Sequence, residues 1–546
     1  MEKSFDEKNS MSADRACALI LGAGLMQRPA ILASKELGFY TVVVDANPAA
    51  ESIPYADFFE QIDLKDRDGI LRFAEDLQRK GNLKAVFTAG TDFSASVSYV
   101  CERLSLPAHS FEAALNASIK PRMRECFKKA GVPSPEFFSL SKDEISEEKV
   151  RFITEALGFP CVVKPADSMG ARGCRMIRTH EEALSAVRVA AEHSRSQTVI
   201  IEEYMEGPEY SIDALIINGS FFVTGFADRH IYYPPYFIET GHTMPTKESE
   251  KRKLELIETF ARGAASLGLT CGAAKADIKY TAKGPQVGEI AARLSGGYMS
   301  GWTFPYSSDC NLTMQALRIA AGEEPEYLLK NSFALPVKNT GYSVFQLPGS
   351  RVSAERAWIS IPGTIKAVEG LDNAKNVLHV ENVFPRPVKA GDAVDFPRNN
   401  VQKCGNVISC ADDYDAAVSA AERACSKILV RLEGNNPRTD AFLQGLASAT
   451  DEQGFPPSAF CSTSELSSLK ISGVIPQDAS VVQHMPPEVI AYAERGERDW
   501  NYLTIMETAR RFDLLVPEHP ALDARRFWLS LLRGGIQGAI YISDSL

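Results

Sequence analysis

The chain has 546 residues, of which 45% are hydrophobic and 24% are charged, values typical of globular proteins. At about 150 residues per domain, this length predicts roughly three to four domains, each able to bury its own core. The formal net charge of −11 argues against broad binding of nucleic acid or anionic membranes, but it leaves room for a local phosphate pocket.

Targeting and redox signals are scarce. No apolar run approaches the roughly 18–20 residues of a membrane helix, and the polar segment Met1–Arg15 lacks the apolar core of a secretory signal. The 11 cysteines are scattered, form no CxxC pair and are odd in number, so we interpret them as reduced thiols. We therefore expect a cytoplasmic protein with no membrane or nucleic-acid partner.

The first hundred residues alternate strand and helix signals. Predicted elements are a strand at 18–21, a helix at about 28–37, a strand at 40–44 that ends in Asp45, and a strand at 84–89 that leads into Asp92. This βαβ order predicts a Rossmann-like parallel sheet, in which ligands bind at the carboxyl ends of the strands.

A Gly22-x-Gly24 turn follows the first strand and suggests a dinucleotide site. The full fingerprint needs a third glycine where this chain has Gln27, although an acid, Asp45, does end the next strand. We therefore favour a structural turn or a small-substrate site over NAD binding.

The next 220 residues predict a mixed α/β region. A helix and exit span 114–137, with Gly131 as its C-cap, and a strand at 159–165 carries Lys164 at its end. Polar and apolar residues alternate over 209–217, as in an antiparallel sheet. Further strands are expected at 174–177, 198–204, 273–280 and 285–290, and an aromatic, proline-rich loop at 232–245.

The remaining sequence changes character twice. Residues 341–430 are β-rich and close with a helix over 413–429. From residue 436 onward, Ser/Ala/Gln-rich stretches alternate with helical segments such as 487–495 and 500–512, in which we find no chemistry. The predicted domains are therefore 1–115, 116–340, 341–435 and 436–546, the last with an open role.

Chemically useful side chains recur at the predicted strand ends. A lysine beside a small-residue loop can neutralise phosphates, and carboxylates on neighbouring strands are hard ligands for Mg²⁺. Each residue also has a purely structural explanation: Lys164 could be a solvated residue at a strand end, and Glu289 and Arg293 could form a surface ion pair. Their ordered occurrence favours a site made of Lys164, the loop Ser168–Gly173, Glu202-Glu203-Tyr204, Glu209, Asp277, Glu289 and Arg293.

This order resembles the ATP-grasp superfamily over about residues 18–435. The resemblance implies an α/β fold with a Rossmann-like N-terminal domain, an ATP-grasp domain with an antiparallel sheet, a β-rich biotin-carboxylase-like module and an extra helical C-terminal extension. It implies ATP and Mg²⁺ (or Mn²⁺), with Asp277 and Glu289 as metal ligands. Nucleotide contacts would come from Lys120, Lys164, Ser168, Met169, Gly170, Gly173, Glu202, Glu203, Tyr204 and Glu209.

One position departs from the family pattern. Residues 289–293 resemble the Glu-x-Asn-x-Arg motif, but Ala291 replaces the asparagine that is the usual third metal ligand. The number of bound metal ions, one or two, is therefore open.

Within the superfamily, the chain is most similar to L-amino acid ligases, through a Glu-x-x-His pair, an Arg-x-x-Gly motif and the β-rich module. Arg293 would act in catalysis, and Gly296 and Gly297 would line the substrate site. Glu239 would hold a substrate ammonium, and His242 would orient the second amino acid or take its proton. A structural loop, with His242 hydrogen-bonded to backbone, is the alternative.

The implied reaction is ATP-dependent ligation of a carboxylate to an amine through an acyl phosphate, giving a dipeptide or an amino-acid amide with ADP and phosphate. The alternatives are another ATP-grasp enzyme, such as a purine-pathway ligase or a biotin-carboxylase-type carboxylase, and a non-catalytic nucleotide-binding regulator. The partners expected are small carboxylate and amine substrates. Their identity and the oligomeric state, for which a homodimer is one option, stay open.

Overall fold

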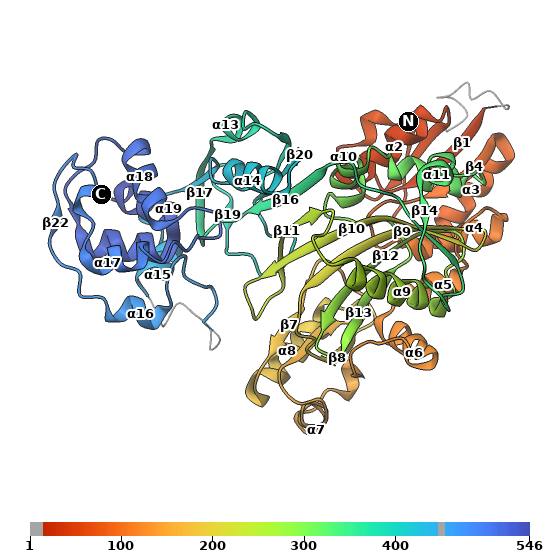
Figure 1. Ribbon diagram of the computed structural model, residues 1–546, viewed down its shortest axis with the longest axis horizontal. Helices are drawn as coiled ribbons and strands as arrows, with labels where there is room; N and C mark the ends of the chain where they lie inside the picture. The colour runs from red at the N-terminus through yellow and green to blue at the C-terminus, as the bar shows by residue number, and fades with distance from the viewer. Residues whose placement is uncertain (1–14, 446–453) are drawn as a thin grey trace. The chain divides into compact units, whose positions relative to one another are not determined.

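The computed structural model describes residues 15–445 and 454–546, so most of the polar N-terminal segment lies outside it. The chain divides into two compact units, each described here by itself (Figure 1). Unit 1 comprises residues 1–161, 194–229 and 243–352, and unit 2 comprises 162–193, 230–242 and 353–546.

Unit 1 begins with the predicted parallel sheet. Its strand order is β3-β2-β1-β4, and every pair is parallel. The strands are β1 (Ala16–Leu21), β2 (Tyr40–Asp45), β3 (Phe58–Gln61) and β4 (Asn82–Phe87), joined by η1 (Leu25–Gln27), α2 (Arg28–Glu36), η2 (Ile53–Tyr55), α3 (Arg67–Lys80) and α4 (Ser94–Leu104). Because helices contact the sheet, β1 is apolar along its whole length and almost entirely buried.

The glycine turn after β1 is held by residues of this domain. Gly22 N donates to Val44 O at 2.7 Å, and Asp45 accepts from Ala23 N at 2.8 Å. The buried Gln27 amide bonds both backbone groups of Ala89. Asp45 and Gln27 thus satisfy the turn internally, which supports the structural interpretation rather than a dinucleotide site.

The second sheet of unit 1 is antiparallel along β13-β12-β9-β10, as predicted. Strand β15 adds to β10 in parallel, and β14 pairs with β15. Helix α9 packs on β12 and β13 (Figure 1). The bounds are β9 (Glu209–Ile217), β10 (Ser220–Tyr232), α9 (Glu250–Leu267), β12 (Gly272–Thr281), β13 (Gly284–Ala291), β14 (Phe333–Ala334) and β15 (Ser343–Gln346).

Helices complete unit 1. The predicted helix at 114–137 is two helices, of which the second ends at Gly131 in the left-handed conformation (φ 63°) that a C-cap glycine adopts. The remaining elements are α5 (Phe111–Ser118), α6 (Lys120–Ala130), β5 (Phe137–Ser141), η3 (Lys142–Glu144), α7 (Glu147–Leu157), β8 (Thr198–Glu203), the π-helical turn η4 (Met299–Thr303), α10 (Phe304–Ser308), α11 (Leu312–Ala320) and α12 (Glu326–Asn331).

Unit 2 contains the β-rich module. Strand β16 pairs with neighbours β11 and β20, β20 with β18, and β17 with β19 and β21. Its elements up to residue 432 are β6 (Cys161–Pro165), β7 (Arg175–Ile177), α8 (His180–His193), β11 (Ile238–Met244), β16 (Val352–Trp358), β17 (Gly363–Glu369), α13 (Leu371–Lys375), β18 (Val380–Pro385), β19 (Ala393–Val394), β20 (Gly405–Ala411), α14 (Tyr414–Cys425) and β21 (Leu429–Leu432).

Two predictions in this region were wrong. The loop expected at 232–245 contains strand β11, whose seven residues are all buried. The strand could not be recognised from the sequence because it carries the polar residues Glu239, Thr240 and His242. The fold buries these side chains and supplies their bonding partners. The helix expected over 413–429 ends at Cys425, because β21 begins at Leu429 and pairs with β17.

The C-terminal extension forms its own apolar core around Trp528 and Phe512. Its elements are α15 (Pro437–Gln444), α16 (Thr463–Ser468), β22 (Val474–Ile475), η6 (Val482–His484), α17 (Pro487–Ala493), α18 (Ile505–Leu515), β23 (Leu522–Asp523) and α19 (Ala524–Asp544). The helix predicted over 500–512 begins only at Ile505, because Thr504 and Glu507 form a capping box.

The extension is tied to the β-rich module. Asp544, at the end of α19, forms a bidentate ion pair with Arg431 of β21 at 2.6 and 2.7 Å. Gln537 bonds Ser360 Oγ and Val430 O, both at 2.7 Å. These contacts are buried or partly buried, so the extension contributes to the folding of this module.

All 11 cysteines lie in the described residues and are unpaired, and seven of them are buried. Across residues 15–445 and 454–546, no helix combines the length and apolar character needed to cross a bilayer.

Candidate active site

The two predicted metal ligands face each other across one strand pair. Asp277 on β12 is the register partner of Glu289 on β13. Direct partners in an antiparallel ladder have Cβ atoms about 4.5–5.5 Å apart, so both carboxylates can reach one cation. Among the described residues no group of three or more His, Cys, Asp or Glu side chains could hold a metal. The pair fits Mg²⁺ that takes its other oxygens from phosphates and water.

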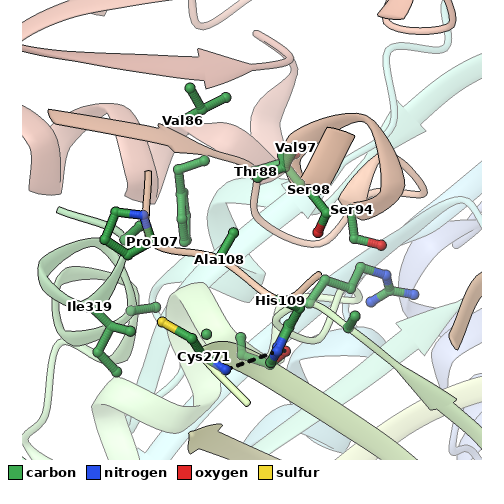
Figure 2. A pocket seen from close by; sticks show the side chains of 17 residues that line it. Val86, Thr88, Ser94, Val97, Ser98, Pro107, Ala108, His109, Cys271 and Ile319 are labelled. Atoms are coloured by element: carbon green, nitrogen blue, oxygen red, sulfur yellow. Dashed lines mark hydrogen bonds between the residues drawn. The ribbon is translucent and has the colours of Figure 1, made fainter. Parts of the chain in front are cut away.

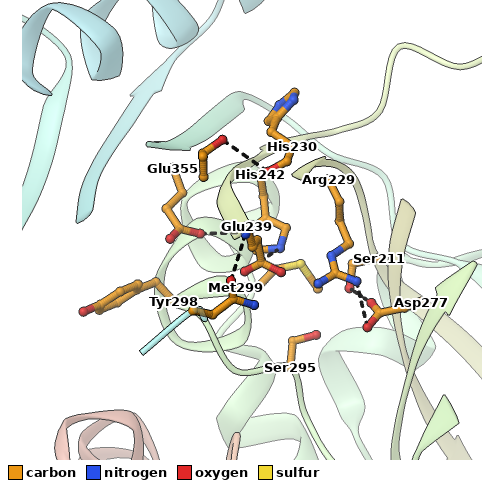
Figure 3. Close-up of polar contacts among 12 residues, drawn as sticks. Ser211, Arg229, His230, Glu239, His242, Asp277, Ser295, Tyr298, Met299 and Glu355 are labelled. Atoms are coloured by element: carbon orange, nitrogen blue, oxygen red, sulfur yellow. Dashed lines mark hydrogen bonds and ion pairs between the residues drawn. The ribbon is translucent and has the colours of Figure 1, made fainter. Parts of the chain in front are cut away.

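Two cationic side chains form ion pairs with the Asp277 carboxylate. Arg229 Nη1 lies 2.8 Å from Asp277 Oδ2 and 2.5 Å from Glu209 Oε1, so it bridges two predicted site residues. Lys275 also pairs with Asp277, and Ser211 Oγ donates to it at 3.1 Å (Figure 3). A metal ion at Asp277 therefore displaces or joins these cations.

The first predicted nucleotide lysine, Lys120, is buried at the first turn of α6. One turn later Arg124, fully buried, donates to Glu202 Oε1 at 2.7 Å and to Gly288 O at 2.7 Å. Arg124 thus ties α6 to β8 and β13, and it occupies a carboxylate that the sequence assigned to the nucleoside. A nucleoside contact of Glu202 stays a prediction and competes with this ion pair.

The other predicted nucleoside contacts lie on the exit of β8. Glu203 is half-buried and lies 3.4 Å from the Lys283 ammonium. The Lys279 ammonium sits 4.9 Å from the centre of the Tyr204 ring and donates to Met205 O at 3.1 Å. The Glu203 carboxylate and the Tyr204 ring therefore each lie beside a lysine from another part of unit 1.

Arg293 follows β13 and is buried, with Nη1 donating to Leu294 O at 2.9 Å. It lines a cavity of about 50 Å³ that also contacts Thr88, Ser98 and His109 (Figure 2). His109 is a core histidine: its nitrogens bond the backbone of 270–273, and burial lowers its pKa to about 4.

Asp92, at the carboxyl end of the parallel sheet, is a site residue that sequence reasoning noted but did not assign. Burial raises its pKa, and Arg293, Arg195 and Lys120 oppose that shift while Glu289 adds to it. These groups are therefore electrostatic neighbours, so unit 1 brings Lys120, Glu289 and Arg293 together around a carboxylate of the N-terminal domain.

The two glycines after Arg293 serve backbone packing. A Cβ on Gly90 would lie 3.2 Å from the Cα of Gly296, and Gly297 has a φ of 63°. Below them the fully buried Asp213 accepts hydrogen bonds from the hydroxyl and the N–H of Ser295. The Arg293–Gly297 segment is thus fixed against the sheet end that carries Asp92.

Unit 2 carries the second lysine and the predicted phosphate loop. Lys164 and the loop residues Ser168 and Met169 are half-buried. Gly170 and Gly173 have φ values of 70° and 69°, which explains the two glycines. Gly170 O accepts from Asn400 N of the β-rich module at 3.0 Å, so the loop is anchored at its tip.

Unit 2 also carries the Glu-x-x-His pair, on β11. Figure 3 shows the His242 ring between two carboxylates: Nδ1 lies 2.7 Å from Glu355 Oε2, and Nε2 lies 3.5 Å from Glu239 Oε1. Burial alone would lower the pKa of His242, but Glu239 and Glu355 raise it to about 9. His242 is therefore a cation at neutral pH, which favours an orienting role over the acceptance of a proton.

Two polar residues, Glu355 in unit 2 and Arg229 in unit 1, carried no usable sequence signal. Glu355 lies in a buried strand, and only the pairing of strands far apart in sequence brings it to His242. Arg229 sits near the end of β10, a strand that was not predicted from the sequence. Asp92 had a signal, its position at a strand end.

Comparison with known families gives two matches. Residues 157–301 match the ATP-grasp domain, and residues 357–433 match the L-amino acid ligase C-terminal domain 2. An uncharacterized protein, y4rH, of Sinorhizobium fredii is 23% identical over 427 residues, which cover 76% of this chain and 82% of that protein.

Solved structures share the fold. The L-amino acid ligase from Bacillus licheniformis matches with a TM-score of 0.63 and 18% identity, over 77% of this chain and 99% of that one. The phosphoribosylglycinamide synthetase from Anaerococcus prevotii matches with a TM-score of 0.58 and 20% identity, over 77% of this chain and 100% of that one. The predicted architecture is thereby confirmed. The domain boundaries and the role of each site residue stay predictions.

Proposed function

We propose that this chain, an ATP-grasp enzyme of the ADP-forming carboxylate–amine ligase type that uses ATP and Mg²⁺, joins two amino acids into a dipeptide or an amino-acid amide. The observation that carries the proposal is the match of residues 357–433 to the L-amino acid ligase C-terminal domain 2. Glu355, two residues before the matched segment on strand β16, contacts His242 of the Glu-x-x-His pair.

The proposed chemistry has two steps. A carboxylate oxygen of the first amino acid attacks the γ-phosphorus of ATP. The bond from the γ-phosphorus to the β–γ bridging oxygen breaks, and ADP leaves with its electron pair. The amine of the second amino acid then attacks the carbonyl carbon of the acyl phosphate, phosphate leaves, and the nitrogen loses a proton. Mg²⁺, held by Asp277 and Glu289, would neutralise phosphate charge.

The chain's own residues supply position and charge. In unit 1, the charges of Arg293, Lys120 and Glu289 all act on the Asp92 carboxylate. A guanidinium such as that of Arg293 can contact a phosphoryl oxygen and a carboxylate oxygen together. Lys120 and Lys164 would neutralise phosphates, and the loop Ser168–Gly173 would cover them. In unit 2, Glu239 would bind a substrate ammonium, with His242 as a fixed donor beside it.

A second candidate keeps the nucleotide chemistry and changes the acceptor. The fold is shared with a phosphoribosylglycinamide synthetase at a TM-score of 0.58. A purine-pathway ligase or a carboxylase would need a pocket for a ribose phosphate or for bicarbonate. The buried acid–imidazolium arrangement of Glu239, His242 and Glu355 suits a small zwitterion better.

The test is ADP and phosphate release across a matrix of amino-acid pairs, with mass detection of products. The proposal predicts that particular pairs release ADP with an equal amount of a condensed product. Release that depends on a ribose phosphate or on bicarbonate, and on no amino acid, would favour the second candidate.

A further inference from the structure

We propose that Glu355, on strand β16 of the β-rich module, is a positioning residue that fixes the His242 ring and holds it as a hydrogen-bond donor toward Glu239. The inference deepens the proposed function, because the Glu239–His242 pair is where the amine-bearing substrate would bind. Its test needs no turnover, so the two can fail separately.

The geometry fixes Glu355 first. Its side chain is fully buried, and Oε1 accepts from Asn406 Nδ2 at 2.6 Å while Oε2 lies 2.7 Å from His242 Nδ1. A buried carboxylate is costly unless its oxygens are bonded, so both contacts restrict its rotation. With Nδ1 engaged, the ring can turn only its Nε2 toward Glu239, at 3.5 Å.

The backbone of β11 is fixed by the same module. Arg356 Nη1 donates to His242 O at 3.0 Å, and Lys403 Nζ donates to Glu239 O at 2.8 Å. Asn400 Oδ1 accepts from Glu239 N at 2.8 Å. Side chains from strand β16 and from the loop before β20 thus set both the position of β11 and the direction of its two functional side chains.

The charges around the ring decide its protonation. Glu239 on β11 and Glu355 on β16 favour the imidazolium, while the charge of Arg356 on β16, whose Nη1 donates to His242 O, opposes it. His230 is neutral, because burial, Arg356 and His242 lower its pKa to about 3. The two carboxylates prevail, so His242 keeps protons on both nitrogens and helps to keep Glu239 ionised for a substrate ammonium.

The test is the titration of His242 by NMR in the full-length chain labelled with ¹⁵N-histidine, with the signal assigned by its loss in His242→Gln. The inference predicts a wild-type midpoint near 9. In Glu355→Gln, which retains the shape but not the charge, the midpoint should fall by about one pH unit or more. The matched control is Glu381→Gln, because Glu381 is an exposed acid of the same module, on β18.

The outcomes are distinct. A wild-type midpoint at or below 6.5 overturns the inference without any variant, and so does an equal midpoint in Glu355→Gln. If Glu355→Gln does not fold, Glu355→Asp keeps the charge with a shorter reach, and the inference predicts a midpoint above that of free histidine. A midpoint near 9 in a chain that ligates no amino acids would support the positioning role and contradict only the proposed function.

Discussion

Asp277 of β12 lies directly opposite Glu289 of β13 in an antiparallel ladder, and the Asp277 carboxylate forms ion pairs with Arg229 and Lys275. The arrangement places two hard oxygen ligands on neighbouring strands, and one of them, Asp277, is held in ion pairs. Metal binding at this position should therefore be coupled to a rearrangement of Arg229, which can keep its second partner, Glu209.

Asp277→Asn and Glu289→Gln should each abolish Mg²⁺-dependent ADP release. A neutral amide is a poorer ligand for a hard cation than a carboxylate, and Asp277 and Glu289 are the two carboxylates proposed to bind the metal. The measurement is the rate of ADP formation as Mg²⁺ is varied. Near-wild-type rates at limiting Mg²⁺ in both variants would contradict the metal assignment.

The fold should survive these changes. In Asp277→Asn, Arg229 keeps its ion pair with Glu209, so the circular dichroism spectrum should match that of the wild type and Tm should fall only slightly. The control is Glu250→Gln on α9, whose carboxylate is 81% exposed and should affect neither turnover nor Tm.

Arg293→Ala should lower kcat by about 10²–10³-fold, the loss typical of removing one donor to developing charge. Arg293→Lys should restore part of the rate, because a point charge cannot reproduce the bidentate guanidinium. Arg318→Ala, which removes a more exposed arginine paired with Glu323, is the control. If kcat is unchanged and only Tm falls, Arg293 is structural.

Glu239→Ala and His242→Ala should alter the choice of acceptor more than ATP affinity. Loss of a hydrogen bond to a charged group is worth about 1.5–3 kcal/mol, so the acceptor KM should rise on the order of 10- to 100-fold. The KM for ATP should change less than about twofold. The reverse pattern, weak ATP binding with unaltered acceptor preference, would place the pair in the nucleotide pocket.

Stability should depend on pH through His242. Its folded pKa of about 9 lies above the unfolded value near 6.5, so the folded chain binds the proton more tightly. The contribution is complete below pH 6.5 and is lost as pH rises through 9. Denaturant midpoints of wild type and His242→Gln should therefore converge between pH 6.5 and 9.5. A constant difference would contradict the raised pKa.

Local patterns predicted most elements that position the nucleotide site. The period-two alternation identified β9, and Gly131 marked the end of α6, whereas Asp277 and Glu289 lie inside β12 and β13 and were assigned from the resemblance to the ATP-grasp family. These features depend on short-range sequence, and so they can be recognised without knowledge of the tertiary structure.

Features that depend on pairing between distant segments escaped prediction. Strand β11 has polar residues at buried positions, and their partners, such as Glu355 of β16 for His242, are brought to them by the fold. Helix α19 was missed because Gly534 and Gly535 interrupt its pattern. Gly535 has a φ of 61°, so the two helical halves meet at a kink. The competition of Arg124 for Glu202 likewise needs the fold to be seen.

The central claim is that a substrate carboxylate attacks the γ-phosphorus of ATP. The most direct measurement uses an amino acid labelled with ¹⁸O in its carboxylate, in a pair that supports ADP release, and analyses the phosphate by mass spectrometry. The account predicts ADP rather than AMP, and one ¹⁸O transferred to phosphate for each condensed product. Formation of AMP and pyrophosphate, or release of unlabelled phosphate together with the product, would contradict it.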